Sequence, residues 1–289
     1  MGARSLQAAL YRLAQPSVPL VVWGTLSERS ELGWGSVRRG LRRAILGVAD
    51  GVLTNGESGA RYISRFGVPD ERIFRVNQPV DVEVFAREPR ARLPGASTRL
   101  LHVGQLIARK GVVGFAEGLA AWARRHPDRE LEIWWAGQGD QREALEEAAL
   151  PPNLAQRFLG SLPYAALPHV YAQCDMLAFP TLCDEWGLVV NEAMATGLPV
   201  LGSVHSQAVE ELVVEGETGW IYDPLAEDAL ATALDRAFAT PPGRRAAMGE
   251  AARRRISALN PASAADRIVR AIEAVLRRGV PAPARPIPE

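Results

Sequence analysis

The chain has 289 residues, 47% hydrophobic and 23% charged, which is typical of a globular protein with about two domains. Its 33 basic and 33 acidic residues balance, so the composition gives no support to general nucleic-acid binding. Two cysteines, Cys174 and Cys183, are too few for a disulfide framework and fit core thiols in a reducing compartment. No apolar run approaches the roughly 20 residues that span a bilayer, and no signal-peptide pattern is present, so we expect a cytoplasmic protein.

Strand-like and helix-like segments alternate along the chain, which predicts parallel sheets with helices on their faces. In the first part, the predicted strands are 19–23, 51–55 and 72–76, and the predicted helices are 36–49 and 58–66. Residues 86–98 are rich in Arg, Pro, Ala and Gly and are predicted to form a linker.

A second alternating series begins after the linker. Its predicted strands are 100–103, 131–136, 157–159, 176–179, 199–201 and 220–222. Its predicted helices include 112–125, 141–149, 164–173, 188–196 and 207–214, and the last is 262–278. The proline-rich tail at 279–289 is predicted to be extended and mobile.

Residues 184–197 are the most informative stretch, because Asp184 and Glu192 flank the start of a predicted helix. The free amides and positive dipole end of a helix N-terminus attract phosphate, and carboxylates accept hydrogen bonds from hydroxyls. A nucleotide-sugar offers both groups. Glu192 lies in an otherwise apolar helix, so its carboxylate needs a partner, either ribose hydroxyls or a neighbouring amide or arginine. Taken alone, the two acids could also be solvated.

The turn at 103–111 follows the first strand of the second series and carries Arg109 and Lys110 between glycines. Such a turn suits a diphosphate at the carboxyl edge of a parallel sheet. A plain strand-to-helix loop with a solvated Arg-Lys pair is the alternative. The segment 137–139, Gly-Gln-Gly, is only a fragment of a dinucleotide fingerprint, and tight turns explain it equally well.

The histidines do not predict a metal site, because none has metal-ligand spacing to another histidine or a cysteine. His205 follows a predicted strand, where a sheet edge could present it to a ligand; a solvated position or one beside a helix cap is the alternative. Trp134 and Trp135 fall inside a continuous apolar strand and are predicted to fill the core. The four histidines are His102, His126, His169 and His205.

The order of the motifs resembles the retaining GT-B glycosyltransferases of family 4, the glycosyltransferase group 1 type. The matching segments are 103–111, 136–139, 158–160, 167–171, 179–181, 184–197 and 211–219, and 77–85 is similar to the family's crossover between domains. The resemblance implies an α/β GT-B fold with a complete C-terminal Rossmann-like domain at 99–260. It also implies a partial N-terminal, acceptor-side Rossmann-like domain at 1–85 and a helix at 261–278 packing back on it.

The resemblance implies roles for individual residues. The family's pair of glutamates falls on Asp184 and Glu192, so Asp184 would face hydroxyls of the transferred sugar and Glu192 the ribose. Lys110 matches the phosphate-binding lysine, Gln105 stands where the family usually has arginine, and Arg109 is a candidate to replace that charge. Asp184 and Lys110 are the catalytic candidates. The donor-binding candidates are Gly104, Gln105, Arg109, Lys110, Asp184, Glu185, Gly187, Leu188, Val189 and Glu192.

The implied chemistry is sugar transfer with retention from a UDP- or GDP-sugar to a carbohydrate or lipid-linked acceptor. Cations and a helix N-terminus would stabilise the leaving diphosphate. The family is regarded as metal-independent, so we expect no cofactor and no metal, and the nucleotide-sugar is a substrate. No nucleic acid is expected as a partner. A peripheral contact with the inner face of the membrane fits a lipid-linked acceptor.

The resemblance is incomplete at the N-terminal end. The helix 2–14 looks like the one before the family's fourth strand, so the apolar strand around 20–22 is expected at a bare sheet edge. Residues 24–26, Gly-Thr-Leu, replace a histidine often found there. We therefore expect an incomplete acceptor site: the true start lies upstream, a partner supplies the rest, or activity is lost. One alternative is a non-catalytic nucleotide-sugar-binding fragment. Another is a GT-B-fold epimerase, although the order of the motifs disfavours the epimerase.

Overall fold

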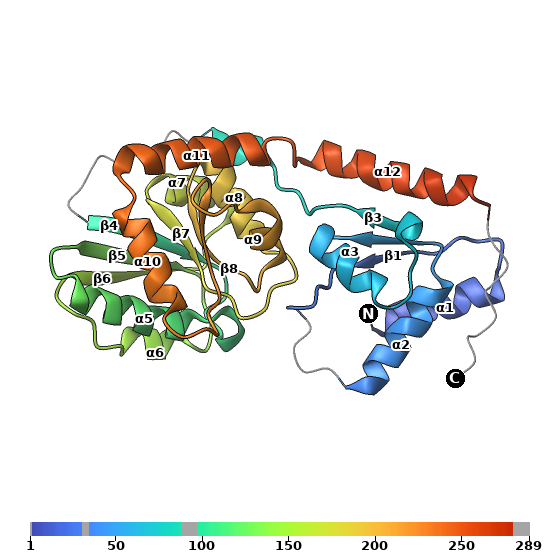
Figure 1. Ribbon diagram of the computed structural model, residues 1–289, viewed down its shortest axis with the longest axis horizontal. Coiled ribbons are helices and arrows are strands. Elements are labelled where there is room, and N and C mark those ends of the chain that lie inside the picture. Colours follow the sequence, from blue (N-terminus) through green and yellow to red (C-terminus); the bar gives the residue numbers. More distant parts are fainter. Residues whose placement is uncertain (1, 31–34, 88–96, 280–289) are drawn as a thin grey trace. The chain divides into compact units, whose positions relative to one another are not determined.

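The computed structural model describes residues 2–30, 35–87 and 97–279, and within these the chain forms two compact units (Figure 1). Unit 1 comprises Met1–Gln78 and Pro261–Glu289, and unit 2 comprises Pro79–Asn260. Most of the predicted linker and almost all of the predicted tail lie outside the described residues. Among the helices that the structure describes, none has the length and apolar character needed to cross a membrane.

Unit 1 is built on a parallel sheet with the order β1-β2-β3. Its elements are α1 (Ala3–Ala14), β1 (Val21–Gly24), α2 (Ser36–Val48), β2 (Gly51–Thr54), α3 (Glu57–Ser64), η1 (Asp70–Arg72), β3 (Ile73–Arg75) and α12 (Pro261–Arg277). Apolar side chains of α1, α2 and α3 pack on one face of the sheet, and those of α12 pack on the other. In the described part of the chain, β1 is an edge strand, as the resemblance implies.

A buried ion pair ties α1 to the start of β2. The Arg12 guanidinium donates to Asp50 with an Nε–Oδ2 distance of 2.8 Å, and the two side chains are only 5% and 9% exposed. Burial raises the pKa of Asp50, but hydrogen bonds from Arg12 and from the amide of Leu20 outweigh this and leave the pKa below its usual value. The pair therefore remains ionised in the folded unit and fixes helix α1 against the sheet.

Unit 2 contains a six-stranded parallel sheet with the order β6-β5-β4-β7-β8-β9. Its strands are β4 (Ser97–Val103), β5 (Glu130–Ala136), β6 (Leu154–Gly160), β7 (Met176–Phe179), β8 (Val200–Ser203) and β9 (Gly219–Tyr222). Its helices are α4 (Val82–Ala86), η2 (Ala108–Lys110), α5 (Val112–Arg125), α6 (Arg142–Glu146), η3 (Tyr164–Ala166), α7 (Leu167–Ala172), α8 (Leu188–Thr196), α9 (Gln207–Leu212), α10 (Ala229–Ala239) and α11 (Pro242–Ile256).

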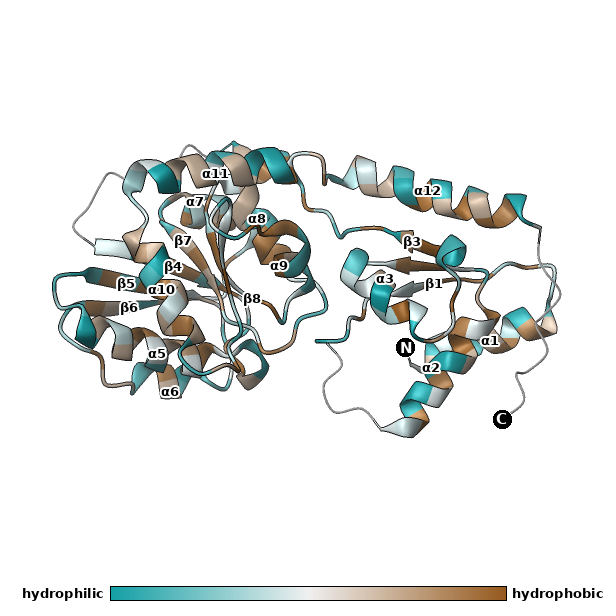
Figure 2. Ribbon diagram, in the orientation of Figure 1, coloured by the Kyte–Doolittle hydropathy of each residue, from teal (hydrophilic) through white to brown (hydrophobic). Residues whose placement is uncertain are grey.

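Two hydrophobic cores lie on the two faces of this sheet. Helices α5, α6 and α10 cover one face, and α4, α7, α8, α9 and α11 cover the other (Figure 1). Trp135 belongs to the first core and Trp134 to the second, and both are buried, which confirms the prediction that they fill the core. Figure 2 shows the central strand β7 brown, the apolar colour, while the outer helices of unit 2 are banded teal and brown. The α/β fold with parallel sheets is confirmed.

The helices of unit 2 differ from the prediction in several places, and no range was predicted for α4, α10 or α11. The helix expected at 141–149 covers only Arg142–Glu146, with Glu147 as its C-cap residue. The helix expected at 164–173 begins as the 3-10 turn η3 and becomes the α-helix α7 only where Pro168 occupies its first turn.

The strand order reverses between β4 and β7. Chain segments from neighbouring strands on either side of such a reversal diverge, and they leave a crevice at the carboxyl ends of the strands. The loop after β4, residues 104–111, and the loop after β7, residues 180–187, both start at this point. The two segments with the strongest sequence signals are therefore neighbours.

Candidate functional site

The loops after β4 and β7 contact each other closely. Gly111 has a φ of 66°, and a Cβ atom at this position would collide with the carbonyl oxygen of Pro180. The amide of Leu182 donates to the carbonyl of Arg109 at 2.9 Å. Only glycine fits at position 111, because the site requires both a left-handed backbone and close approach of a second chain segment.

Lys110 and Asp184, the two predicted catalytic residues, come together as an ion pair. The Lys110 ammonium donates to Asp184 Oδ2, and each side chain is 14% exposed. Lys110 is also the only lysine in a chain that has 33 lysines and arginines in all. A lysine presents a compact charge where an arginine presents a planar fork, so an arginine at position 110 would bind Asp184 with different geometry.

The N-terminus of α8 lies beside this ion pair. Gly187 precedes the helix with a φ of 105°, and a Cβ atom there would lie 2.7 Å from the Phe179 ring. In the described structure no side chain caps this helix. Leu188 is 41% exposed, and Val189 is partly exposed. The start of α8 can therefore present amide donors and a positive dipole end to an anion.

Glu192 lies one turn further along α8 and is only 6% exposed. Its Oε2 accepts a hydrogen bond from the Tyr171 hydroxyl at 2.8 Å. Burial raises the pKa of Glu192 above its ordinary value, and the Tyr171 hydrogen bond opposes the shift. The sequence reasoning predicted a ribose, an amide or an arginine as the partner and missed Tyr171, although this residue belongs to one of the resembling motifs.

The remaining donor-binding candidates support the loops or are exposed. Arg109 donates from Nη1 to the carbonyl of Cys183 at 2.7 Å, so it joins the two loops. Gln105 and Glu185 are exposed. Gly104 has a φ of 143°, and a Cβ atom on Gly137 would collide with its carbonyl oxygen.

The Gly-Gln-Gly segment at 137–139 holds the β4 loop in place. The amide of Leu106 donates to the carbonyl of Gln138 at 2.9 Å, and a Cβ atom on Gly139 would collide with the carbonyl of Leu106. The segment thus acts as a tight turn that lets two backbones approach.

Two histidines lie close to the site but are buried. His205 is 7% exposed, and its Nε2 is 2.9 Å from Asp223 Oδ1. Its carbonyl accepts from the amide of Asp184, and the next residue, Ser206, caps α9. The prediction that His205 lies beside a helix cap is confirmed, whereas the alternative prediction that it is solvated is wrong. Burial lowers the pKa of His102 to about 4, so this histidine is neutral at physiological pH.

An open parallel sheet whose strand order reverses beside the start of a helix defines a Rossmann-like domain. Residues 87–255 match the family model of the glycosyl transferases group 1. The chain belongs to this family. Membership places it among enzymes that transfer glycosyl groups.

Curated relatives agree with this assignment. The chain is 30% identical to a GDP-mannose-dependent α-(1-6)-phosphatidylinositol monomannoside mannosyltransferase of Mycolicibacterium smegmatis, over 82% of this chain and 69% of the relative. It is 28% identical to a D-inositol 3-phosphate glycosyltransferase of Corynebacterium kroppenstedtii, over 84% of this chain and 57% of the relative. The chain thus spans between about half and two thirds of the length of such relatives.

Solved structures share the fold. HepE of Anabaena, solved in complex with UDP, matches with a TM-score of 0.73 at 19% identity. The match covers 93% of this chain and 76% of the HepE chain. The lipopolysaccharide outer core galactosyltransferase WaaB has a TM-score of 0.73 at 18% identity, over 94% of this chain and 72% of its own. At these identities the similarity establishes the GT-B fold alone.

Proposed function

We propose that the chain transfers a sugar from a UDP- or GDP-linked donor to a carbohydrate or lipid-linked acceptor, with retention of the anomeric configuration. The observation that carries the proposal is the juxtaposition of Lys110, Asp184 and the N-terminus of α8 at the strand-order reversal. A cation and free amides suit a diphosphate, and a neighbouring carboxylate suits sugar hydroxyls.

The proposed donor lies along the first turns of α8. Lys110 and the amides of Leu188 and Val189 hold the diphosphate. Glu192 lies four residues after Leu188, about 6 Å further along the helix axis, which is close enough for one nucleotide to contact both places. The buried Glu192 carboxylate then accepts from the ribose hydroxyls in addition to Tyr171.

The ion pair between Lys110 and Asp184 supplies a switch on donor binding. An arriving diphosphate competes with Asp184 for the Lys110 ammonium, and the displaced carboxylate becomes free to accept from hydroxyls of the transferred sugar. In the transfer step, negative charge develops on the leaving nucleoside diphosphate, where Lys110 and the helix dipole stabilise it. The leaving phosphate accepts the proton of the acceptor hydroxyl, and same-face attack gives retention.

The proposal includes no cofactor and no metal. It places the protein in the cytoplasm, with peripheral contact at the inner membrane face where the acceptor is lipid-linked. Support for a lipid-linked acceptor comes from the named mycobacterial relative, whose acceptor is a phosphatidylinositol monomannoside.

Donor binding without transfer is the second candidate. It is favoured by β1, which is an open edge in the described part of the unit 1 sheet. If unit 1 does not hold an acceptor, unit 2 could still bind the donor without transfer.

Isothermal titration with UDP-glucose and GDP-mannose, paired with assays of donor hydrolysis and transfer, separates the two functions. Transfer to one of a set of carbohydrate and polyprenyl-phosphate sugar acceptors, with the anomeric configuration read by NMR, supports the first. Binding without turnover supports the second. A chain that binds neither donor nor free UDP or GDP would contradict both.

A further inference from the structure

The hydrogen-bond partner of the Glu192 side chain comes from a different helix. Tyr171 lies near the end of α7, is fully buried, and donates its hydroxyl to Glu192 Oε2 at 2.8 Å. The same hydroxyl lies 3.4 Å from the carbonyl oxygen of Val189. Its single proton goes mainly to Glu192, because that acceptor is nearer and charged. Tyr171 therefore contacts both the carboxylate proposed to bind ribose and the turn of α8 proposed to hold the diphosphate.

The two carboxylate oxygens of Glu192 have different surroundings. Oε2 is bonded to Tyr171, whereas Oε1 has no hydrogen-bond partner in the described structure. Oε1 is not one of the buried unpaired side-chain atoms of that structure, so it retains accessible surface. A ligand hydroxyl can thus reach Oε1 without touching Tyr171. The carboxylate is held through one oxygen and can bind a ligand through the other.

The Tyr171 ring is itself held in place from α4. Phe85 of α4 is fully buried and contacts the Tyr171 ring edge to face, with the two ring centroids 5.8 Å apart. Burial, and after it the charge of Glu192, raise the pKa of Tyr171 well above its usual value, so the hydroxyl keeps its proton. Tyr171 is therefore a hydrogen-bond donor in a fixed position across the physiological pH range.

Burial and the Tyr171 hydroxyl set the protonation of Glu192. Burial raises the pKa of Glu192, and the Tyr171 hydrogen bond opposes that shift. Burial, and after it the Glu192 charge, raise the pKa of Tyr164 of η3, so this ring is also near the carboxylate. The other titratable side chains on elements packed against α8 do not contribute to the shift of Glu192. They include His169 of α7, Asp81 and Glu83 of α4, Glu210 and Glu211 of α9, and Arg253 of α11.

We propose that Tyr171 is a positioning residue of the donor site: its hydroxyl fixes the Glu192 carboxylate so that Oε1 accepts from a ribose hydroxyl. The inference rests on the proposed function, because it requires a nucleotide bound along α8. Tyr171 itself does not touch the nucleotide. Without its hydroxyl, Glu192 gains rotational freedom that ribose binding must remove, which weakens the affinity about two- to tenfold.

The test compares UDP and GDP with their 2′- and 3′-deoxy counterparts by isothermal titration of the full chain between about pH 5 and about pH 8. The ratio of the deoxy Kd to the ribo Kd measures the hydrogen bond to the ribose, since phosphate ionisation is the same in both ligands. In the wild type this ratio should fall as the pH drops through the pKa of Glu192, because protonation removes the charge of the carboxylate.

Tyr171→Phe keeps the ring and removes the hydroxyl. Near the upper end of the pH range it should make the ratio about two- to tenfold smaller. The hydrogen bond that lowers the pKa of Glu192 is lost, so the ratio should also fall at a pH about one to two units higher than in the wild type.

A second measurement needs no nucleotide. Protein labelled with carbon-13 at the glutamate carboxyl groups identifies the Glu192 NMR signal as the one missing from Glu192→Gln. The titration midpoint of this signal should lie about one to two pH units higher in Tyr171→Phe than in the wild type. A residue that only fills the core would not move this midpoint.

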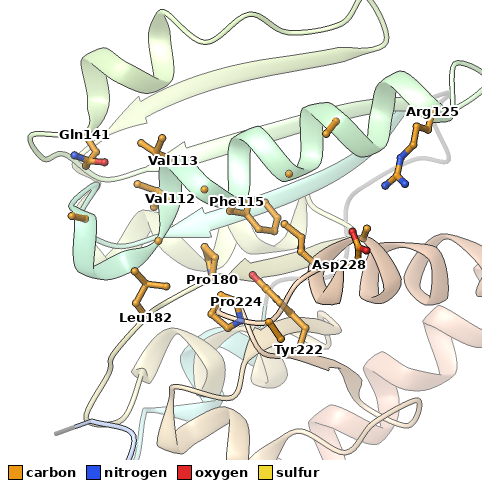
Figure 3. A pocket seen from close by; sticks show the side chains of 18 residues that line it. Val112, Val113, Phe115, Arg125, Gln141, Pro180, Leu182, Tyr222, Pro224 and Asp228 are labelled. Carbon is orange, nitrogen blue, oxygen red and sulfur yellow. The ribbon is translucent and has the colours of Figure 1, made fainter. Parts of the chain in front are cut away.

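Tyr222→Phe is the matched control. Tyr222 is also buried in unit 2, but it belongs to the core on the opposite face of the sheet, beside the pocket next to α5 (Figure 3). Its hydroxyl has no hydrogen-bond partner in the described structure. The control should keep the wild-type ratio and the wild-type midpoint of Glu192.

The inference is overturned if Tyr171→Phe leaves either the ratio or the Glu192 midpoint unchanged. Equal weakening of the ribo and deoxy nucleotides, with the ratio unchanged, would show a general loosening of α8 instead of positioning. A wild-type chain that binds neither UDP nor GDP contradicts the proposed function, and this inference falls with it. Nucleotide binding by the wild type that Tyr171→Phe leaves unchanged contradicts the inference alone, so the two failures are distinguishable.

Discussion

Replacing Glu192 by glutamine should separate the stability of unit 2 from its ability to bind a nucleotide. Glu192 is a buried carboxylate with a raised pKa, and Tyr171 donates its hydroxyl to it. Glutamine has nearly the same shape, and its amide oxygen can accept from Tyr171. Because the substitution removes a buried charge, we expect the free energy of unfolding to stay unchanged or to rise by about 1 kcal/mol.

The same substitution should weaken donor binding strongly. Hydrogen bonds between ribose hydroxyls and an ionised carboxylate are charge-assisted, and each contributes about 1.5–3 kcal/mol. Loss of one such bond lowers the affinity for UDP or GDP by about tenfold to hundredfold. A buried carboxylate that lowers the stability of the fold but strengthens ligand binding is typical of functional sites.

Chemical denaturation gives the unfolding free energy, and isothermal titration with UDP and GDP gives the affinity. Glu117→Gln, on the exposed side of α5, is the matched control and should change neither quantity. Unchanged nucleotide affinity in Glu192→Gln would refute the ribose role. A loss of more than about 1 kcal/mol in unfolding free energy would show instead that the carboxylate is structural.

Three further substitutions test the surrounding structure. Gly111→Ala should lower the unfolding free energy by about 1–3 kcal/mol and weaken nucleotide binding, because of its positive φ and the contact with Pro180; unchanged values would contradict the loop geometry. His102 has a pKa of about 4 when folded and about 6.5 when unfolded, so stability should fall as the pH drops from 6.5 to 4, by about 3 kcal/mol. His102→Gln should remove that part of the pH dependence in denaturation curves, and an identical curve would show that His102 is not its source. Arg12→Ala leaves Asp50 buried without its counter-charge and should cost unit 1 about 3–5 kcal/mol; a cost below about 1 kcal/mol would mean that the pair is solvated.

The sequence predicts every described strand and most helices because buried parallel strands are short apolar runs separated by helical periodicity and glycine. The helix α8 is an example: Gly187 and Gly197 bound it in the sequence and in the structure. The helices α4, α10 and α11 are the exceptions, since no range was predicted for them. The approach of the loops after β4 and β7 is also predictable, since both follow strands of one parallel sheet.

Side-chain partners across elements are not predictable in the same way. Glu192 contacts Tyr171 only because α7 packs on α8, and no local spacing encodes that packing. The same holds for His205, whose partner Asp223 follows a different strand. Arg109 was expected to face phosphate but donates to a backbone carbonyl of the neighbouring loop, a contact that depends on the strand order.

The most direct test of the donor site uses Lys110, the only lysine of the chain. Protein labelled with carbon-13 at the lysine ε position gives a single lysine side-chain NMR signal that needs no assignment. We predict that UDP or GDP shifts this signal at saturation, because the diphosphate replaces Asp184 as the partner of the ammonium, whereas uridine and guanosine leave it unmoved. A signal that stays in place while titration shows the nucleoside diphosphate bound would contradict the donor site at Lys110.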